Sequence, residues 1–211
     1  MKALVIGATG AVGKDLVKML LEYASCESVT VFVRRPFGLE NPKLNVHIVD
    51  FDCPGDWRHL LCGDVLFSCL GTTIRAAGSQ DAQWKVDYTY QLEAAKAARE
   101  NGVETYVLVS SVGASARSKV FYTRMKGALE EEVKTLGFPC CYILQPPSLV
   151  RKGSDRFGEK AGVAFLKAFN AVGLMTSLKP MPTEAVAAAM IRLSKSGRKG
   201  TETIVSQDIL G

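Results

Sequence analysis

The fold of this chain is constrained most by a regular alternation of short apolar runs and amphipathic segments, which begins at the first residue. Residues 2–7, "KALVIG", form an apolar run, and residues 11–23 carry apolar side chains at helical spacing. By the same criteria, strands are predicted at residues 2–7, 28–33, 45–49, 64–70, 104–111, 139–146 and 201–206, and helices at 11–23, 82–101, 120–136 and 184–195. Strands that alternate with helices pair in parallel through right-handed crossovers. We therefore predict an α/β protein with a doubly wound parallel sheet and helices on both faces.

The alternation stops after Pro146 and Pro147. Residues 148–181 begin with a polar, glycine-rich stretch and end with "KPM", and only residues 163–172 between them are amphipathic. A segment of about 30 residues cannot bury a core of its own. We therefore interpret residues 1–211 as one domain in which residues 148–181 form a small C-terminal lid on the substrate side.

Composition excludes several classes of protein. Hydrophobic residues make up 47% of the chain and charged residues 22%, with a net charge of +5, so neither disorder nor a nucleic-acid partner is expected. Gly7 and Gly10 break the first apolar run after four residues, and no run reaches the ~18 apolar residues of a membrane span. We expect a cytoplasmic location, no membrane partner and a small-molecule substrate. The six cysteines show no Cys-x-x-Cys spacing, so no metal site is predicted.

The turn "GATGAVG" at residues 7–13 has the spacing of a phosphate-binding turn. Gly7, Gly10 and Gly13 lie three residues apart between the first strand and the first helix. Glycine lets the backbone approach a pyrophosphate, whose charge is met by the helix N-terminus. The turn predicts a Rossmann-type dinucleotide-binding domain. The alternative is a tight turn that packs the helix on the strand without a ligand.

Two arginines, Arg34 and Arg35, end the second strand. An acidic side chain at this place, roughly 20 residues after the glycine turn, would bind the ribose hydroxyls of NAD. Guanidinium groups pair instead with the 2′-phosphate of NADP. We therefore expect NADP(H) to be favoured over NAD(H), with solvated surface arginines as the alternative.

Two further strand ends point to the same crevice, because ligands of open α/β sheets lie beyond the carboxyl ends of the strands. Asp50 and Phe51 follow the third strand and suit the adenine edge, although Asp50 could equally form a turn. Gly71 follows the fourth strand and lets the chain pass close to a cofactor. The hydroxyls of Thr72 and Thr73 are then in reach of phosphate or ribose.

Four polar residues are expected at the end of the fifth strand. Ser110 and Ser111 end the strand, and Tyr122 and Lys126 open the following helix. Residues four apart share a helix face, so Lys126 is expected to lower the pKa of Tyr122 from its ordinary value of about 10. Such a phenol exchanges a proton with a substrate oxygen while a hydride moves to or from nicotinamide, and a serine hydroxyl polarises that oxygen. The alternative is an exposed Tyr and Lys on an ordinary helix.

Together these motifs resemble the short-chain dehydrogenase/reductase superfamily over residues 1–150. More narrowly, "CLGTTIRAAGS", "VDYTYQLEAAKAA", "VSSVGASA" and "FYTRMKGALEEEV" resemble its atypical branch, which includes the Tat-interacting-protein oxidoreductase and its bacterial relatives. The resemblance implies that Tyr122 donates or accepts the proton and that Lys126 binds the nicotinamide ribose. It also implies that Arg34 and Arg35 bind the 2′-phosphate.

The chain departs from the family pattern at three places, one of which is "VRKGSDR" at residues 150–156 in place of a Gly-Asp-Arg-like turn. Asp87 stands where many extended members carry an asparagine of the proton relay, and Gln145 precedes Pro146 where relatives often have Arg-Pro. Arg156 is our choice for the arginine that approaches the nicotinamide or the substrate. Ser111 is preferred over Ser110 as the active-site hydroxyl.

The predicted catalytic residues are Ser111, Tyr122 and Lys126. The predicted cofactor contacts are Gly7, Thr9, Gly10, Ala11, Val12, Gly13, Arg34, Arg35, Asp50, Phe51, Leu70, Gly71, Thr72, Thr73, Ser110, Tyr122, Lys126 and Arg156.

Two hypotheses for the function follow. The first is an NADP(H)-dependent oxidoreductase that acts on a carbonyl or alcohol, or runs an epimerase-like cycle with bound cofactor. The second is an adaptor that senses the NADPH/NADP ratio with little turnover and acts through a regulatory protein partner. A homodimer is compatible with both. The presence of Ser111, Tyr122 and Lys126 together favours chemistry, because a sensor has no need of the phenol.

Overall fold

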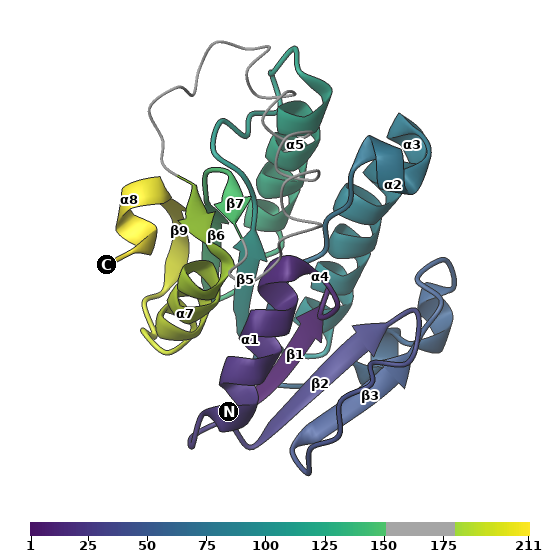
Figure 1. Ribbon diagram of the computed structural model, residues 1–211, viewed down its shortest axis with the longest axis vertical. Coiled ribbons are helices and arrows are strands. Elements are labelled where there is room, and N and C mark those ends of the chain that lie inside the picture. Colours follow the sequence, from purple (N-terminus) through teal and green to yellow (C-terminus); the bar gives the residue numbers. More distant parts are fainter. Residues whose placement is uncertain (151–179) are drawn as a thin grey trace.

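A seven-stranded parallel sheet forms the centre of the molecule (Figure 1). The computed structural model describes residues 1–150 and 180–211. The sheet order is β3-β2-β1-β4-β5-β6-β9. The strands are β1 (Lys2–Ile6), β2 (Ser28–Val33), β3 (Leu44–Ile48), β4 (Val65–Ser68), β5 (Thr105–Val109), β6 (Cys140–Gln145) and β9 (Gly200–Val205). The predicted doubly wound α/β fold is confirmed.

The chain starts in the middle of this sheet. β1 pairs with β2 on one side and with β4 on the other, both in parallel. The strand order therefore reverses at β1, and a reversal of this kind opens a crevice beyond the carboxyl ends of the two strands that flank it. The glycine-rich turn after β1 and the loop after β4 both lead into this crevice.

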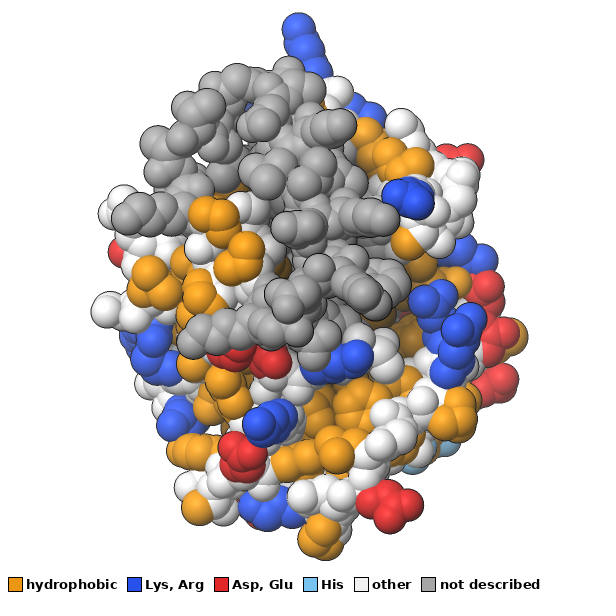
Figure 2. Space-filling view, viewed as in Figure 1, with side chains coloured by type: hydrophobic (Ala, Val, Ile, Leu, Met, Phe, Trp, Pro, Cys, Tyr) orange, Lys and Arg blue, Asp and Glu red, His pale blue; other side chains and the backbone are white. Residues whose placement is uncertain are grey.

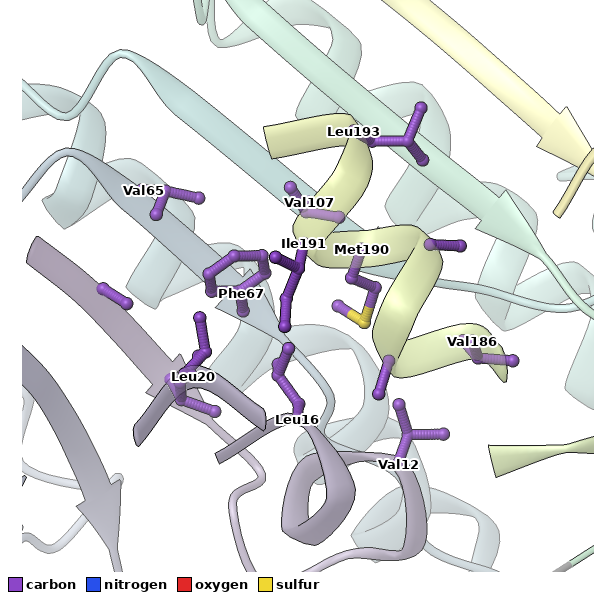
Figure 3. Close-up of a cluster of buried hydrophobic side chains, with 14 of the residues drawn as sticks. Val12, Leu16, Leu20, Val65, Phe67, Val107, Val186, Met190, Ile191 and Leu193 are labelled. Atoms are coloured by element: carbon purple, nitrogen blue, oxygen red, sulfur yellow. The ribbon is translucent and has the colours of Figure 1, made fainter. Parts of the chain in front are cut away.

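Helices cover the two faces of the sheet and bury a separate core on each. The helices α1 (Ala11–Glu22) and α7 (Thr183–Ser194) pack together on one face, where Leu16, Phe67 and Met190 meet in an entirely apolar cluster (Figure 3). The helices α4 (Tyr90–Glu100) and α5 (Phe121–Thr135) cover the other face. Burial of aliphatic and aromatic side chains in these two layers is the main driving force for the fold.

The predicted helix at residues 82–101 is a composite of three segments. It consists of α3 (Gln80–Trp84), the π-helical segment η3 (Lys85–Thr89) and α4. A π-helical turn adds a residue to the helical repeat, and such turns are frequent at functional sites. The apolar pattern of the flanking helix continues across it, so periodicity alone did not reveal it.

Four short helices were not predicted, because three or four residues are too few to show a helical period. They are η1 (Pro54–Asp56), η2 (Arg58–Leu60), α2 (Ile74–Ala77) and α8 (Ser206–Ile209). In α2 the side chain of Thr73 accepts a hydrogen bond from the amide of Ala76 and caps the helix. The helix predicted to start after Thr183 starts at Thr183 itself, with Pro182 at the cap position.

The two ends of the predicted lid lie side by side. β7 (Leu149–Val150) pairs in parallel with β8 (Met181–Pro182). Most of the segment between them, including Arg156 and the amphipathic stretch 163–172, lies outside the described residues.

The connection from β2 to β3, residues 34–43, contains no helix. As a result the sheet is uncovered over β3 on the side of α1, and hydrophobic side chains are visible there in Figure 2. Val46 and Ile48 of β3 are 38% and 60% exposed. The outer strand β3 is therefore partly exposed on this face of the sheet.

Candidate cofactor and active site

The glycine-rich turn requires glycine at two positions for steric reasons. Gly7 has a φ of +81°, and a Cβ atom there would lie 2.3 Å from the backbone carbon of Cys69 in the loop after β4. A Cβ on Gly13 would lie 2.2 Å from the carbonyl oxygen of Gly7. The glycines thus bring the turn, α1 and the β4 loop into backbone contact at the crevice.

The first turn of α1 has the chemistry of an anion site. It contains no acidic residue, and no side chain from the described parts of the chain caps it at Gly10. The first amides of a helix lack partners within the helix and carry a partial positive charge. Thr9 and Ala11 are exposed beside these amides, whereas Val12 is buried against α7. The turn and its helix therefore fit the pyrophosphate of a dinucleotide.

The ends of β2 and β3 are adjacent, since Val33 is in register with Ile48. Arg34 and Arg35 follow β2 directly, and both are exposed. Asp50 is exposed as well, but the ring of Phe51 is buried against the rings of Trp57 and Tyr90. Phe51 is thus a core residue by its side chain, and only its backbone remains to contact a nucleotide.

Two buried side chains hold the loop after β4. The amide of Thr72 donates to Oδ2 of Asp87 at 2.8 Å, and the carbonyl oxygen of Thr72 accepts from Nε2 of Gln83 at 2.9 Å. Leu70 packs on the core beneath α4, and Gly71 is exposed. A loop fixed at both its amide and its carbonyl is preorganised to contact a cofactor.

The π-helical segment η3 carries Asp87 and is itself anchored to the sheet. Nε2 of Gln91 donates to the carbonyl oxygen of Asp87 at 2.6 Å, and Oε1 of Gln91 accepts from the hydroxyl of Ser68 at 2.7 Å. Both side chains are completely buried. Satisfied polar networks in a low dielectric are rigid, so Asp87 has a fixed position.

Lys126 on α5 forms a buried ion pair with Asp87. Its Nζ lies 3.3 Å from Oδ1 of Asp87, and the two side chains are 4% and 1% exposed. Burial raises the pKa of Asp87, while the charge of Lys126 and the Thr72 amide lower it. Burial is the larger effect, so the pKa of Asp87 lies above its ordinary value. Burial lowers the pKa of Lys126, but the carboxylate of Asp87 and its hydrogen bond with the ammonium group outweigh burial, and the pKa is raised. Lys126 is therefore a permanent ammonium group.

Tyr122 is one turn before Lys126 and forms a hydrogen bond with Ser111. Burial raises the pKa of the phenol, the charge of Lys126 lowers it, Asp87 raises it again and the Ser111 hydroxyl lowers it. The net direction is upward, so the predicted lowering of the Tyr122 pKa is wrong. The prediction considered Lys126 alone and missed both the loss of water around the partly buried Tyr122 and the carboxylate of Asp87 beside the lysine.

The two serines at the end of β5 have different partners. The hydroxyl of Ser110 donates to Oε1 of the buried Glu130, and Nε2 of Gln145 donates to both oxygens of that carboxylate at 3.0 Å. The hydroxyl of Ser111 instead forms a hydrogen bond with Tyr122. The geometry thus gives Ser110 a partner in the core and Ser111 a partner in the predicted catalytic group, and the predicted cofactor contact of Ser110 stays a prediction.

A close backbone contact places the loop that follows Ser111. A Cβ on Gly127 would lie 2.2 Å from the carbonyl carbon of Ser115, so residues 115 and 116 cross α5 at van der Waals distance. The amide of Ser115 also donates to the carbonyl oxygen of Thr123 at 3.0 Å. These contacts fix the loop between Ser111 and α5.

The structure thus brings Ser111, Tyr122 and Lys126 together, and it adds Asp87, Gln83 and Glu130 as their supports. None of the three supports was among the predicted site residues. The sequence does contain a pattern that could have revealed Gln83 and Asp87. Together with Gln91 they are polar residues at four-residue spacing, on the buried face of an alanine-rich helix. Polar residues on a buried face require partners.

The described residues contain no group of three potential metal ligands among His, Cys, Asp and Glu. Within residues 1–150 and 180–211, no helix is long and apolar enough to cross a membrane.

Comparison with known proteins agrees with this geometry. A family model described as NAD(P)H-binding matches residues 7–160. The oxidoreductase ylbE from Lactococcus lactis superposes with a TM-score of 0.71 over 99% of this chain and 95% of its own, at 16% identity. UDP-glucose 4-epimerase of Thermus thermophilus, solved with NAD, has a TM-score of 0.72 over 97% of this chain and 77% of its own, at 20% identity. Fold and site together define an NAD(P)-binding Rossmann protein.

Proteins with similar sequences give a more specific comparison than the shared fold does. The protein named "Protein FMP52, mitochondrial" of Meyerozyma guilliermondii is 36% identical over 206 residues, which are 96% of this chain and 89% of that protein. The protein of the same name in Saccharomyces cerevisiae is 38% identical over 71% of this chain and 66% of its own. The chain belongs to the NAD(P)H-binding family, and this membership agrees with the resemblance to the atypical short-chain dehydrogenases/reductases that its motifs predicted.

The predicted cytoplasmic location is contradicted by these relatives, which are named mitochondrial proteins. The prediction used the absence of a secretory signal and of a membrane span. These features argue against secretion, but they do not separate the cytoplasm from an organelle.

Proposed function

We propose that this protein is an NADP(H)-dependent oxidoreductase that acts on a carbonyl or alcohol through Ser111, Tyr122 and Lys126. The observation that carries the proposal is the position of Tyr122 between the Ser111 hydroxyl and the buried Lys126 ammonium group, at the carboxyl edge of the sheet. A buried lysine next to a phenol is a costly arrangement, and one that suits proton transfer.

Each residue has a distinct role in this proposal. A nicotinamide dinucleotide, when bound, supplies or removes a hydride at the substrate carbon. Ser111 orients and polarises the substrate oxygen, and Tyr122 holds the proton that this oxygen gains or loses. Lys126 has the charge and reach to hold the ribose beside the phenol, and Asp87 keeps the ammonium group in place.

The preference for NADP(H) rests on Arg34 and Arg35. Both are exposed directly after β2, where the ribose of the adenosine half would lie, and an acidic residue that would select NAD is absent from this place. Titration of the purified protein with NADPH and NADH, followed by nucleotide fluorescence, tests the preference. Equal affinities would remove the role of the two arginines.

Turnover is tested by screening carbonyl and quinone compounds for NADPH oxidation. We expect the variant Tyr122→Phe to lose at least about 10²-fold in kcat. Its affinity for NADPH is expected to stay within about threefold, since a phenyl ring preserves the packing. Tight NADPH binding with no turnover of any compound would support the adaptor hypothesis instead. Turnover that survives Tyr122→Phe would exclude the phenol from the mechanism.

We also propose that the protein associates with mitochondria, on the strength of its similarity to proteins named mitochondrial. Expression of a fluorescent fusion in yeast with a mitochondrial marker tests this. A diffuse signal at native expression level would contradict it.

A further inference from the structure

The charge of Lys126 is matched inside the protein before any ligand binds. Asp87 lies 3.3 Å from the ammonium group, and both side chains are nearly inaccessible to water. Ion pairs in a low dielectric are screened little by salt or solvent. Tyr122 therefore faces a lysine whose field is offset in part by a neighbouring carboxylate.

The other groups around the phenol reinforce this balance. Glu130, one turn further along α5, adds a second buried acidic side chain on the far side of Lys126. Cys69 at the end of β4 also lies within the field of Lys126, and burial raises the pKa of its thiol to about 12, so it stays neutral. Ser111 contributes a hydroxyl without charge. Among the described residues, Lys126 thus has two carboxyl groups beside it, those of Asp87 and Glu130.

We propose that Asp87 keeps Tyr122 as a neutral phenol, so that the resting site is a proton donor built for carbonyl reduction. This inference rests on the proposed function and adds a direction to it. In that reduction the carbonyl carbon gains a hydride from NADPH, the C=O π bond opens, and the oxygen takes the proton of Tyr122. The products are the alcohol and NADP⁺, and the phenolate regains its proton from water. Asp87 is a positioning residue in this scheme, since it acts through Lys126.

The charge of Asp87 can be removed while its hydrogen bond is kept. Asp87→Asn retains an oxygen that accepts from the Thr72 amide, but it leaves the ammonium group of Lys126 without its counter-charge. An uncompensated cation beside a phenol favours the phenolate. The variant is therefore expected to lower the pKa of Tyr122, which a purely structural role of Asp87 would not do.

The test is an ultraviolet difference titration of tyrosine in protein free of dinucleotide. Six tyrosines absorb, so the signal of Tyr122 is taken as the difference between each protein and its Tyr122→Phe counterpart. We expect Tyr122 of the wild type to titrate above the ordinary phenol range and that of Asp87→Asn to titrate lower. The control Asp81→Asn removes an exposed acidic side chain from α3 and is expected to match the wild type.

Ionisation of Tyr122 well below the ordinary range in the wild type would overturn the inference. An unchanged or higher pKa in folded Asp87→Asn would do so too, and if this variant does not fold the wild-type titration decides. The titration needs no cofactor, so failure to bind NADPH or to turn over a carbonyl would count against the proposed function separately. For the active enzyme, the pH above which reduction slows is expected to move downward in Asp87→Asn.

Discussion

The role of a side chain in this site depends on its hydrogen-bond partner and not only on its residue type. Ser110 and Ser111 are adjacent and chemically identical, yet one hydroxyl is bound to the buried Glu130 and the other to Tyr122. The sequence predicted both serines at the right strand end. It also favoured Ser111 as the active-site hydroxyl, but it did not reveal the partner of either serine, because the direction of each side chain depends on where the strand stops being extended.

Replacement of the two serines by alanine is expected to affect different properties, stability for Ser110 and kcat for Ser111. Ser110→Ala removes a donor from a buried carboxylate and should lower the free energy of unfolding by about 1.5–3 kcal/mol, with little effect on kcat. Ser111→Ala should lower kcat by about 10²-fold at nearly unchanged stability. Urea unfolding and steady-state kinetics of both variants check this. The reverse assignment follows if Ser110→Ala is the variant that loses activity.

Replacement of Arg34 or Arg35 by glutamine should weaken NADPH binding about tenfold or more, because each guanidinium group contributes charge-assisted hydrogen bonds worth about 1.5–3 kcal/mol. Binding of NADH, which lacks the 2′-phosphate, should be unchanged. Arg198→Gln is a matched control, since Arg198 pairs with Glu202 at the amino end of β9. Fluorescence titrations with both nucleotides measure the effect. A loss shared equally by NADPH and NADH would argue against 2′-phosphate recognition.

At the scale of elements, α5 and the composite helix α3-η3-α4 form one functional unit. One turn of α5 presents Tyr122 and Lys126, and η3 presents the carboxylate that pairs with the lysine. The positions of both helices were predictable from their apolar periodicity. The π-helical turn between α3 and α4 was not, because the hydrogen-bond shift that defines it leaves no mark in the apolar pattern.

The crossing of the Ser111 loop over α5 depends on a single missing side chain. Gly127→Ala would push a methyl group into the backbone of Ser115, so we expect a loss of about 1–3 kcal/mol in stability and reduced activity. Gly55→Ala is the control, because no atom lies within 4 Å of a Cβ at that position. Thermal unfolding of both variants checks this. Equal melting temperatures would mean that the loop moves away from α5 at no cost.

At the scale of the whole molecule, the thiols of the buried Cys141 and the partly buried Cys69 link stability to pH. Burial raises the pKa of Cys141 to about 11 and that of Cys69 to about 12, from an ordinary value of 9.0. The folded protein keeps these protons where the unfolded chain has lost them. Stability should therefore be unaffected below about pH 9 and fall as the pH rises toward 11–12.

Melting temperatures measured between pH 8 and pH 11 test this linkage. Cys141→Val, which removes one of the two titrating thiols from the core, should make the decline shallower. An identical decline in the variant would assign the alkaline loss to other groups, since several tyrosines titrate in the same range.

The order of strands and helices was predictable because each buried strand is a nearly continuous apolar run, as in β1 and β4. The location of the crevice followed from the same pattern. The charge balance around Tyr122 was not predictable, because Asp87 and Lys126 are 39 residues apart in the sequence and meet only after α4 and α5 pack on the sheet. Only the three-dimensional arrangement shows that the lysine already has a partner.

The connection from β2 to β3 contains no helix, and this affects which part of the sheet unfolds locally most easily. β3 has one neighbouring strand and little cover on the α1 side, so few contacts must break to release it. Amide hydrogen exchange should therefore be fastest in β3 and slowest in β1 and β4, which have strands on both sides. Arg34 and Arg35 sit on the connection that leads to β3, so bound NADPH is expected to slow exchange in the outer strand more than in the centre of the sheet.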